Sequence, residues 1–228
     1  MAEKTLRTSA SDRTGRAGRT GNARNGRAQR SSDRILTAAA ELARERGIHG
    51  TTIAAVSKRS GLPASSIYWH FTDKDELFAE VIRTDFARWL TTVPQWNTPE
   101  GTPLRDGLAG ILRTAVPQTL REVPDFIRIG MQVVLDQREA YAAARNAFLA
   151  TRAQTFEMIR AWLDRTMPPE TDPVDIEALA RLILAFCDGA LVASQANPDL
   201  DIAEHIELFL DVFMAAVAAA QPGEQGGG

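Results

Sequence analysis

Six side chains that donate hydrogen bonds lie within one short stretch of the 228-residue chain. They are Thr51, Thr52, Tyr68, Trp69, His70 and Lys74. Hydroxyl, indole, imidazole and ammonium groups are donors of the kind that bind the phosphate oxygens of a nucleic-acid backbone. Two adjacent aromatic residues followed by a histidine are also unusual for the buried face of a short helix. These residue types therefore predict non-covalent binding of a polyanion.

The segments around these donors have the apolar spacing of short helices. Apolar residues recur at helical intervals from Ile35 to Ala43, and Gly47 ends the run. The helices expected here span about 33–46, 52–60, 64–71 and 73–93. Gly61 permits a tight turn between the two shortest helices. The pattern is therefore a helix-turn-helix within a three-helix unit.

The start of the 64–71 helix is where a recognition helix contacts the edges of bases. Ala64, Ser65 and Ser66 occupy this position. Their short side chains limit direct base readout to single hydrogen bonds and methyl contacts. Lys74 follows in the first turn of the next helix, where the helix dipole already favours a phosphate.

Beyond residue 93 the sequence shows helical periods and no strand pattern. After a linker at 94–103, helices are expected at 104–121 (interrupted or kinked by Pro117), 124–136, 138–167, 174–196 and 202–220. The predicted fold is all-α, with an N-terminal helix-turn-helix domain at 31–78 joined to a C-terminal helical bundle at 79–220. Residues 1–30 and 221–228 are rich in glycine and polar residues, and we expect both segments to be disordered.

Charge is distributed unevenly along the chain. Residues 1–30 carry eight basic and two acidic side chains, whereas residues 79–228 carry 12 basic and 21 acidic ones. Six arginines are closely spaced in the basic segment: Arg13, Arg16, Arg19, Arg24, Arg27 and Arg30. They are suited to the minor groove or the phosphates of DNA. The alternative is a solvating tail, or a start-site artefact.

The order of residues from Thr51 to Leu77 resembles the DNA-binding domain of the TetR (tetracycline repressor-like) family of transcription regulators. The resemblance covers residues 33–80 and depends most on Tyr68-Trp69-His70-Phe71 with Lys74 after it. It implies that Thr51 or Thr52, Tyr68, Trp69, His70 and Lys74 touch the phosphate backbone. It also implies that residues 64–66, and Tyr68 in part, face the bases. Because Ala64, Ser65 and Ser66 include no Gln or Arg, DNA shape is expected to supply much of the specificity.

By the same resemblance, residues 79–220 bind a small effector and form a homodimer. The candidate pocket residues are Trp89, Phe126, Met131, Gln132, Phe148, Arg152, Phe156, Ile159, Trp162 and Asp188. An apolar or aromatic effector would suit this lining. The residues expected at a dimer seam are Leu179, Ile183, Leu184, Leu191, Ile206, Phe209, Leu210, Phe213, Met214 and Val217, with the bundle core as the alternative.

The resemblance implies a repressor that leaves a palindromic operator when the effector binds. The helix from Lys74 to Val93 joins the two domains and would carry that change. The alternative function is non-specific, nucleoid-type DNA binding through the basic segment. Two observations separate the two: sequence preference, and dependence of affinity on salt.

Other classes of protein find no support in the sequence. The three histidines and the single cysteine, Cys187, form no metal-ligand pattern, and we predict no enzyme activity and no cofactor. No apolar run approaches the roughly 20 residues of a membrane-spanning helix. One cysteine also allows no disulfide framework, which suits the cytoplasm.

Overall fold

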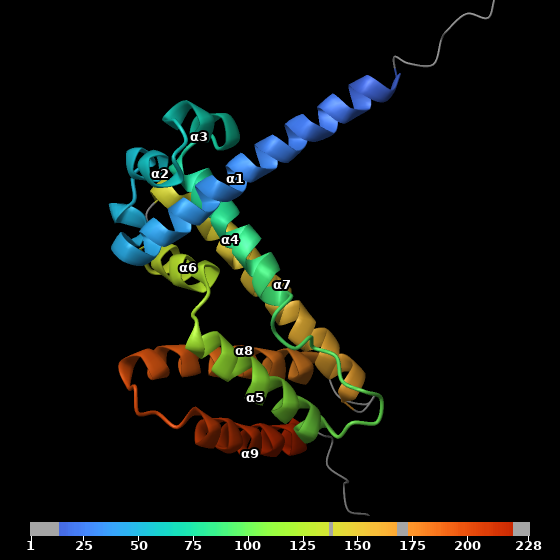
Figure 1. Cartoon of the computed structure of the whole chain (residues 1–228). Coiled ribbons are helices and arrows are strands. Elements are labelled where there is room, and N and C mark those ends of the chain that lie inside the picture. The colour runs from blue at the N-terminus through green and yellow to red at the C-terminus, as the bar shows by residue number, and fades with distance from the viewer. Residues whose placement is uncertain (1–13, 137–138, 168–172, 221–228) are drawn as a thin grey trace, which may run out of the picture. The chain divides into compact units, whose positions relative to one another are not determined.

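The computed structural model describes residues 14–136, 139–167 and 173–220. Over these ranges the prediction of an all-α fold is confirmed, with nine α-helices, one 3₁₀ turn and no strand. The elements in Figure 1 are α1 (Thr14–Gly50), α2 (Ile53–Ser60), α3 (Ala64–His70), α4 (Lys74–Leu90), α5 (Leu104–Arg121), α6 (Asp125–Asp136), η1 (Glu139–Tyr141), α7 (Ala142–Thr166), α8 (Pro173–Ala196) and α9 (Ile202–Ala220). The chain divides into an N-terminal unit, Met1–Phe78, and a C-terminal unit, Ala79–Gly228.

The N-terminal unit packs α1, α2 and α3 around a small apolar core. Ile35, Val56 and Ile67 come one from each helix and are completely buried. Full burial of such a side chain stabilises a fold by roughly 1.5–3 kcal/mol. Two glycines set the corners of this unit. Gly47, at φ 71°, breaks the helical path within α1, and Gly61, at φ 66°, makes the left-handed turn between α2 and α3.

Helix α1 begins much earlier than the sequence predicts. It starts at Thr14, so the expectation of disorder is wrong for residues 14–30. This stretch holds no proline, and its arginines and alanines, which favour helices, outnumber its glycines. The hydroxyl of Ser31 donates to the carbonyl of Arg27 at 3.0 Å and supports the helix there. Residues 1–13 and 221–228, and the side chains of the arginines before residue 26, lie outside the described part of the chain.

The C-terminal unit is a helical bundle. Helices α5, α8 and α9 pack on one another, and α7 packs against both α6 and α8 (Figure 1). Side chains that are almost completely buried in its core include Leu108, Leu112, Trp162, Leu163, Ile183, Leu210 and Phe213. Contrary to prediction, Pro117 does not interrupt α5. Burial of neighbouring Leu112 and Val116 keeps the helix in place and offsets the hydrogen bond that proline cannot donate.

Most of the residues expected at a dimer seam lie inside this bundle instead. Leu179, Ile183, Leu191, Ile206, Phe209, Leu210, Phe213 and Val217 are buried in the isolated chain. Their spacing of three and four residues directs them to the inner face of α8 and α9. The exposed apolar side chains of these helices are others, namely Val192, Leu208 and Val212.

Two further features are absent from the described residues. None of the helices there combines the length and the apolar character needed to span a bilayer. No group of three His, Cys, Asp or Glu side chains in that part of the chain is arranged to hold a metal ion.

Candidate functional site

Helix α3 presents its polar and aromatic residues outward. Ile67 is fully buried, whereas Tyr68 and Trp69 next to it are 56% and 73% exposed. Ser65 is exposed, and Ala64, Ser66 and His70 are half-buried. The indole of Trp69 stands edge-on to the imidazole of His70, with ring centroids 4.6 Å apart. The two large aromatic side chains are therefore surface groups, and packing in the core does not account for them.

Helix α3 is held by a network of polar contacts at its start. The hydroxyl of Ser57 donates to the carbonyl of Leu62 at 2.7 Å. The guanidinium of Arg34 donates to the carbonyl of Ser60 at 2.6 Å, at the end of α2. These bonds satisfy backbone groups that the tight turn leaves open, and they attach the turn to α1. The outward face of α3 is therefore carried by a rigid base.

The two candidate threonines before α2 have different places. Thr52 is exposed and caps α2, its hydroxyl accepting from the amide of Ala55 at 3.1 Å. Thr51 is completely buried, and its hydroxyl donates to the carbonyl of Gly47 at 2.9 Å. The break in α1 leaves that carbonyl without a donor from its own helix, and the buried hydroxyl of Thr51 supplies one. The structure thus places Thr52, and not Thr51, where it could reach a phosphate.

Lys74 is the first residue of α4 and is bound within the N-terminal unit. Its ammonium group donates to the carbonyls of Ile48 and Thr51, both at 3.1 Å. Both carbonyls belong to the corner between α1 and α2. Lys74 therefore ties the start of α4 to that corner, a role that the sequence did not reveal.

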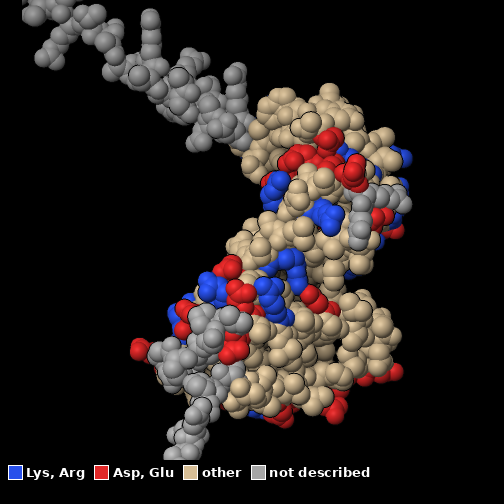
Figure 2. Space-filling model, turned by 180° about the vertical axis from the view of Figure 1, so that it is seen from behind, with Lys and Arg blue, Asp and Glu red and all other residues tan. Residues whose placement is uncertain are grey.

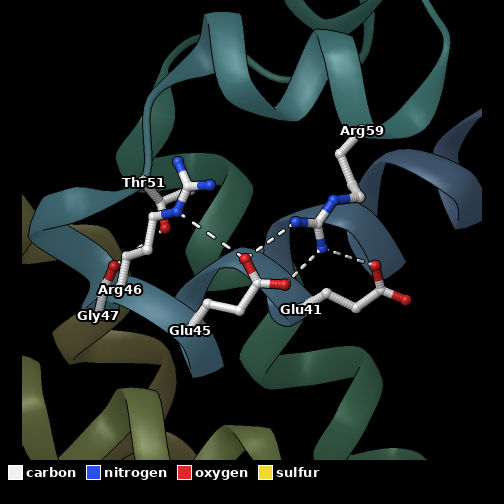
Figure 3. A network of polar contacts seen from close by, with 6 residues as sticks. All are labelled: Glu41, Glu45, Arg46, Gly47, Thr51 and Arg59. Atoms are coloured by element: carbon white, nitrogen blue, oxygen red, sulfur yellow. Dashed lines mark hydrogen bonds and ion pairs between the residues drawn. The ribbon is translucent and has the colours of Figure 1, made fainter.

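An ion-pair network between α1 and α2 was also not anticipated (Figure 3). Arg59 donates to both carboxylate oxygens of Glu45, at 2.8 and 2.9 Å, and to Glu41 at 3.2 Å. The hydrogen bond from Arg59 lowers the pKa of Glu45 and raises that of Arg59 itself. The signal was present in the sequence, because Glu41 and Glu45 are one helical turn apart. Only the fold could show which arginine meets them.

Charge is mixed over the surface as well. Figure 2 shows acidic and basic side chains next to one another on the face in view, with wide areas that carry neither. On this face no single sign dominates.

A cavity lies within the C-terminal unit. It encloses about 810 Å³ of space not filled by atoms, including the part open to solvent. The apolar lining comes from α4 to α8 and the 91–103 linker: Trp89, Val93, Pro94, Trp96, Ile111, Leu112, Ala115, Val116, Leu120, Phe126, Ile127, Ile159, Leu184 and Leu191. The polar lining residues are Thr119, Arg152, Thr155, Cys187 and Asp188. A mostly apolar lining with a few polar groups is typical of sites for small organic molecules.

Five of the ten predicted pocket residues line this cavity, namely Trp89, Phe126, Arg152, Ile159 and Asp188. The other five, Met131, Gln132, Phe148, Phe156 and Trp162, are not among its lining residues. Phe148 instead packs on Gly130, and Trp162 is buried and donates to the hydroxyl of Thr98 at 3.1 Å. The contribution of α5 was missed, because nothing in an apolar helical pattern tells a cavity wall from a core.

The cavity wall holds one ion pair. Arg152 of α7 donates a short hydrogen bond to Asp188 of α8. Burial raises the pKa of Asp188, while Arg152 acts in the opposite direction. Burial also raises the pKa of the neighbouring Cys187 thiol to about 12, so that this cysteine stays protonated and unreactive at neutral pH.

The geometry of the N-terminal unit agrees with a comparison of its sequence with known families. Residues 35–81 match the family model described as bacterial regulatory proteins of the tetR family. This segment of the chain belongs to the TetR family. The match runs from α1 into α4 and includes all six donors singled out in the sequence.

Similarity to known proteins extends over most of the chain. It is 27% identical over 197 residues to the HTH-type transcriptional repressor AcnR of Corynebacterium diphtheriae, covering 82% of this chain and 92% of AcnR. A putative transcriptional regulator of Pseudomonas aeruginosa PAO1 superposes with a TM-score of 0.69 at 18% identity, covering 83% and 93% of the two chains. The complex of SmeT, from Stenotrophomonas maltophilia, with triclosan superposes with a TM-score of 0.62 at 22% identity. The match covers 82% of this chain and 90% of SmeT. These two structures share their fold with this chain.

Proposed function

We propose that this TetR-family protein represses transcription by binding a palindromic DNA operator as a homodimer, and that a small apolar or aromatic effector releases it. It acts in the cytoplasm as a binding protein and not as an enzyme. The single observation that carries the proposal is the geometry of α3, where buried Ile67 anchors a helix whose Ser65, Tyr68 and Trp69 face outward. A short exposed helix on a rigid base suits the major groove of B-DNA.

Within this proposal each candidate residue has a place. Ala64, Ser65 and Ser66 face the bases with Tyr68, while Thr52, Trp69 and His70 bind phosphates. Lys74 supports them by fixing the corner between α1 and α2. The likeness to AcnR, a repressor by name, favours repression over activation.

The homodimer is proposed from the outer face of α8 and α9. Val192, Leu208 and Val212 are exposed there, and Gly189 has open space beside it. A single helix-turn-helix contacts too few bases for useful specificity, so pairing would provide a second half-site. Leu208→Glu with Val212→Glu should convert the dimer to a monomer in light scattering after gel filtration. The control is Leu135→Glu, at an exposed position on α6.

Effector release is proposed from the cavity and from α4. Trp89 near the end of α4 lines the cavity, and Lys74 at its start holds the corner beneath the DNA-binding helices. A ligand that shifts this helix would bias the spacing of the two DNA-binding units in a dimer. SmeT, a structural neighbour, is known in complex with triclosan, which supports a small-molecule effector.

Selection of binding sites from a random duplex pool tests the proposal directly. The purified full-length chain is used at two salt concentrations. We expect enrichment of a palindrome at both, and loss of enrichment for the Leu208→Glu, Val212→Glu variant. DNA retained only at low salt, with no enriched sequence, would instead support the nucleoid-type alternative.

A further inference from the structure

We propose that the effector is an organic anion, an apolar body with one carboxylate group, and that this carboxylate replaces Asp188 as the partner of Arg152. The inference rests on the proposed function, since it names the class of molecule that fills the cavity. The carboxylate goes beyond the proposed function, which gives this cavity only an apolar or aromatic ligand.

The first argument is the chemistry of the lining. Fourteen of the nineteen lining residues are apolar, so the body of the ligand must be apolar. The two threonine hydroxyls have partners, because Thr155 donates to the carbonyl of Thr151 at 2.9 Å and Thr119 accepts from the indole of Trp89 at 3.3 Å. Among the described lining residues the charged ones are Arg152 and Asp188. A polar head group that enters the cavity therefore meets this pair.

The second argument is an asymmetry between the two members of the pair. Arg152 and Asp188 form a part-buried pair, with 29% and 36% of their side chains exposed. Removing one partner of such a pair leaves the other charge without its counter-ion, which is unfavourable. Arg152 cannot escape that cost, because a guanidinium does not lose its proton in proteins. Asp188 can avoid that cost, because a carboxylate that loses its cationic partner can take up a proton. Burial already raises the pKa of Asp188. The site therefore tolerates a ligand that takes Arg152 from Asp188, and it resists one that takes Asp188 from Arg152.

Geometry fits this exchange. Arg152 lies on α7 and Asp188 on α8, and both side chains line the cavity. The guanidinium has a planar fork of donors that binds a carboxylate through two hydrogen bonds. A ligand carboxylate would thus break a contact between α7 and α8 as it forms its own. The ligand would in this way loosen one helix pair of the bundle.

Two series of probes that differ only in the head group test the inference. One series is decanoate, decan-1-ol and decylamine, and the other is 2-naphthoate, 2-naphthalenemethanol and 2-naphthalenemethylamine. Binding to the full-length protein is measured by calorimetry without DNA. In at least one series we expect the anion to bind at least about tenfold more tightly than the alcohol, which corresponds to about 1.4 kcal/mol. The amine should bind most weakly. An amine or alcohol that binds best in both series overturns the inference, as does absence of binding by both anions.

Two substitutions should move anion affinity in opposite directions. Arg152→Gln should remove the preference for the anion over the alcohol. Asp188→Asn removes the competing carboxylate, so it should tighten binding of the anion several-fold. Arg160→Gln is the matched control, since Arg160 is an exposed arginine of α7 that pairs with Glu157 at 2.9 Å and does not line the cavity. Weaker anion binding by Asp188→Asn would contradict the exchange, even if Arg152→Gln failed to fold.

The exchange also predicts proton uptake. From α7 the carboxyl of Asp188 faces Arg152, and on its own helix it adjoins Cys187, whereas the lining residues of α4, α5 and α6 include no titratable side chain. Anion affinity should therefore fall as pH rises, by up to about tenfold per pH unit, and Asp188→Asn should abolish the slope. A wild-type affinity that does not change with pH contradicts the exchange.

Failure of this inference is distinguishable from failure of the proposed function. Head-group preference is measured on the protein alone, whereas repression and release are measured on the selected operator. An anion that binds through Arg152 but leaves operator affinity unchanged would uphold the ligand class and refute its role as effector. An alcohol that binds best and releases the operator would do the opposite.

Discussion

The N-terminal and C-terminal units arrange their candidate binding residues in opposite ways. In the first, most of the residues proposed to contact DNA lie close together in the chain, between Ala64 and His70, and they are exposed or half-buried. In the second, they are spread from Trp89 to Leu191 over five helices and the linker between α4 and α5, and they surround a space. A rigid polyanion outside the protein is met by side chains that project. A small molecule inside it would occupy a cavity that the side chains leave unfilled.

This difference teaches how far a site can be recognised from its residues. Two adjacent aromatic residues followed by a histidine, Tyr68-Trp69-His70, go against the usual composition of a buried helix face, and that departure is visible in the sequence. The apolar residues of the cavity violate no rule. Each behaves as a core residue would, and the cavity exists only because neighbouring helices leave room between them.

Substitution of the exposed aromatic residues of α3 should give the largest effect on DNA binding. We expect Tyr68→Ala with Trp69→Ala to weaken binding to the selected operator by about 100-fold, equivalent to about 2.7 kcal/mol. Thermal stability should change little, because both side chains are exposed. Fluorescence anisotropy and circular dichroism measure the two quantities. Leu135→Ala, an exposed residue of the C-terminal unit, is the control and should alter neither.

Gly130 offers the converse test, in which stability is lost and the residues of the DNA interface are unchanged. A Cβ atom at this position would lie 2.1 Å from the ring of Phe148, which is buried. Gly130→Ala should therefore reduce the free energy of unfolding by about 3 kcal/mol. Gly110→Ala in α5 is the matched control, because its Cβ meets no atom within 4 Å. Urea denaturation that gives equal midpoints for the two variants would exclude the clash.

Lys74 is proposed to support the DNA contacts, and it also stabilises the N-terminal unit. A substitution can separate these two roles. Lys74→Met keeps the length of the side chain and removes the bonds to the carbonyls of Ile48 and Thr51. Hydrogen bonds from charged groups contribute roughly 1.5–3 kcal/mol, so we expect a loss of stability of about 2 kcal/mol. Amide hydrogen exchange should rise around residues 48–56. A variant that loses affinity for DNA with no change in exchange would show that Lys74 serves only as a phosphate contact.

The smallest expected effect is a contrast in pH dependence. Burial raises the pKa of Asp85 above its ordinary value of 3.8, although this carboxylate accepts a hydrogen bond from the amide of Phe126 at 3.0 Å. The folded state then binds more protons than the unfolded one, so this residue's contribution to stability falls as pH rises from about 4 through the raised pKa. Glu45 has the opposite sign, since its pKa is lowered by Arg59 and its contribution is lost on acidification.

The variant Asp85→Asn tests the first half of this contrast. Its free energy of unfolding, relative to that of the wild type, should increase between pH 4 and pH 7 in urea denaturation. Glu45→Gln should show the reverse trend, in which its disadvantage relative to the wild type shrinks as pH falls. Parallel curves for the wild type and Asp85→Asn would mean that burial does not shift this carboxyl group.

Most of the fold could be predicted from the sequence because helix boundaries are local. Gly47, Gly61 and the Asn197-Pro198 turn end helices where they stand, and the expected bounds of α5 and α9 are those observed. Two predictions based on local sequence rules, one for glycine and one for proline, were wrong because the surrounding residues outweighed them. The glycines before residue 30 did not prevent α1 from continuing, and Pro117 did not interrupt α5.

The sequence alone predicts which residues contact DNA, because two adjacent aromatic residues and a histidine are unusual in a core and all three lie on one short helix. Tertiary structure alone decided that Thr51 is buried and that Lys74 ties two elements together. It also decided which half of the candidate pocket residues share a cavity, and that the inner faces of α8 and α9 fill the bundle. The physical reason is that burial and empty space are properties of neighbours distant in the chain, which no local spacing of residues encodes.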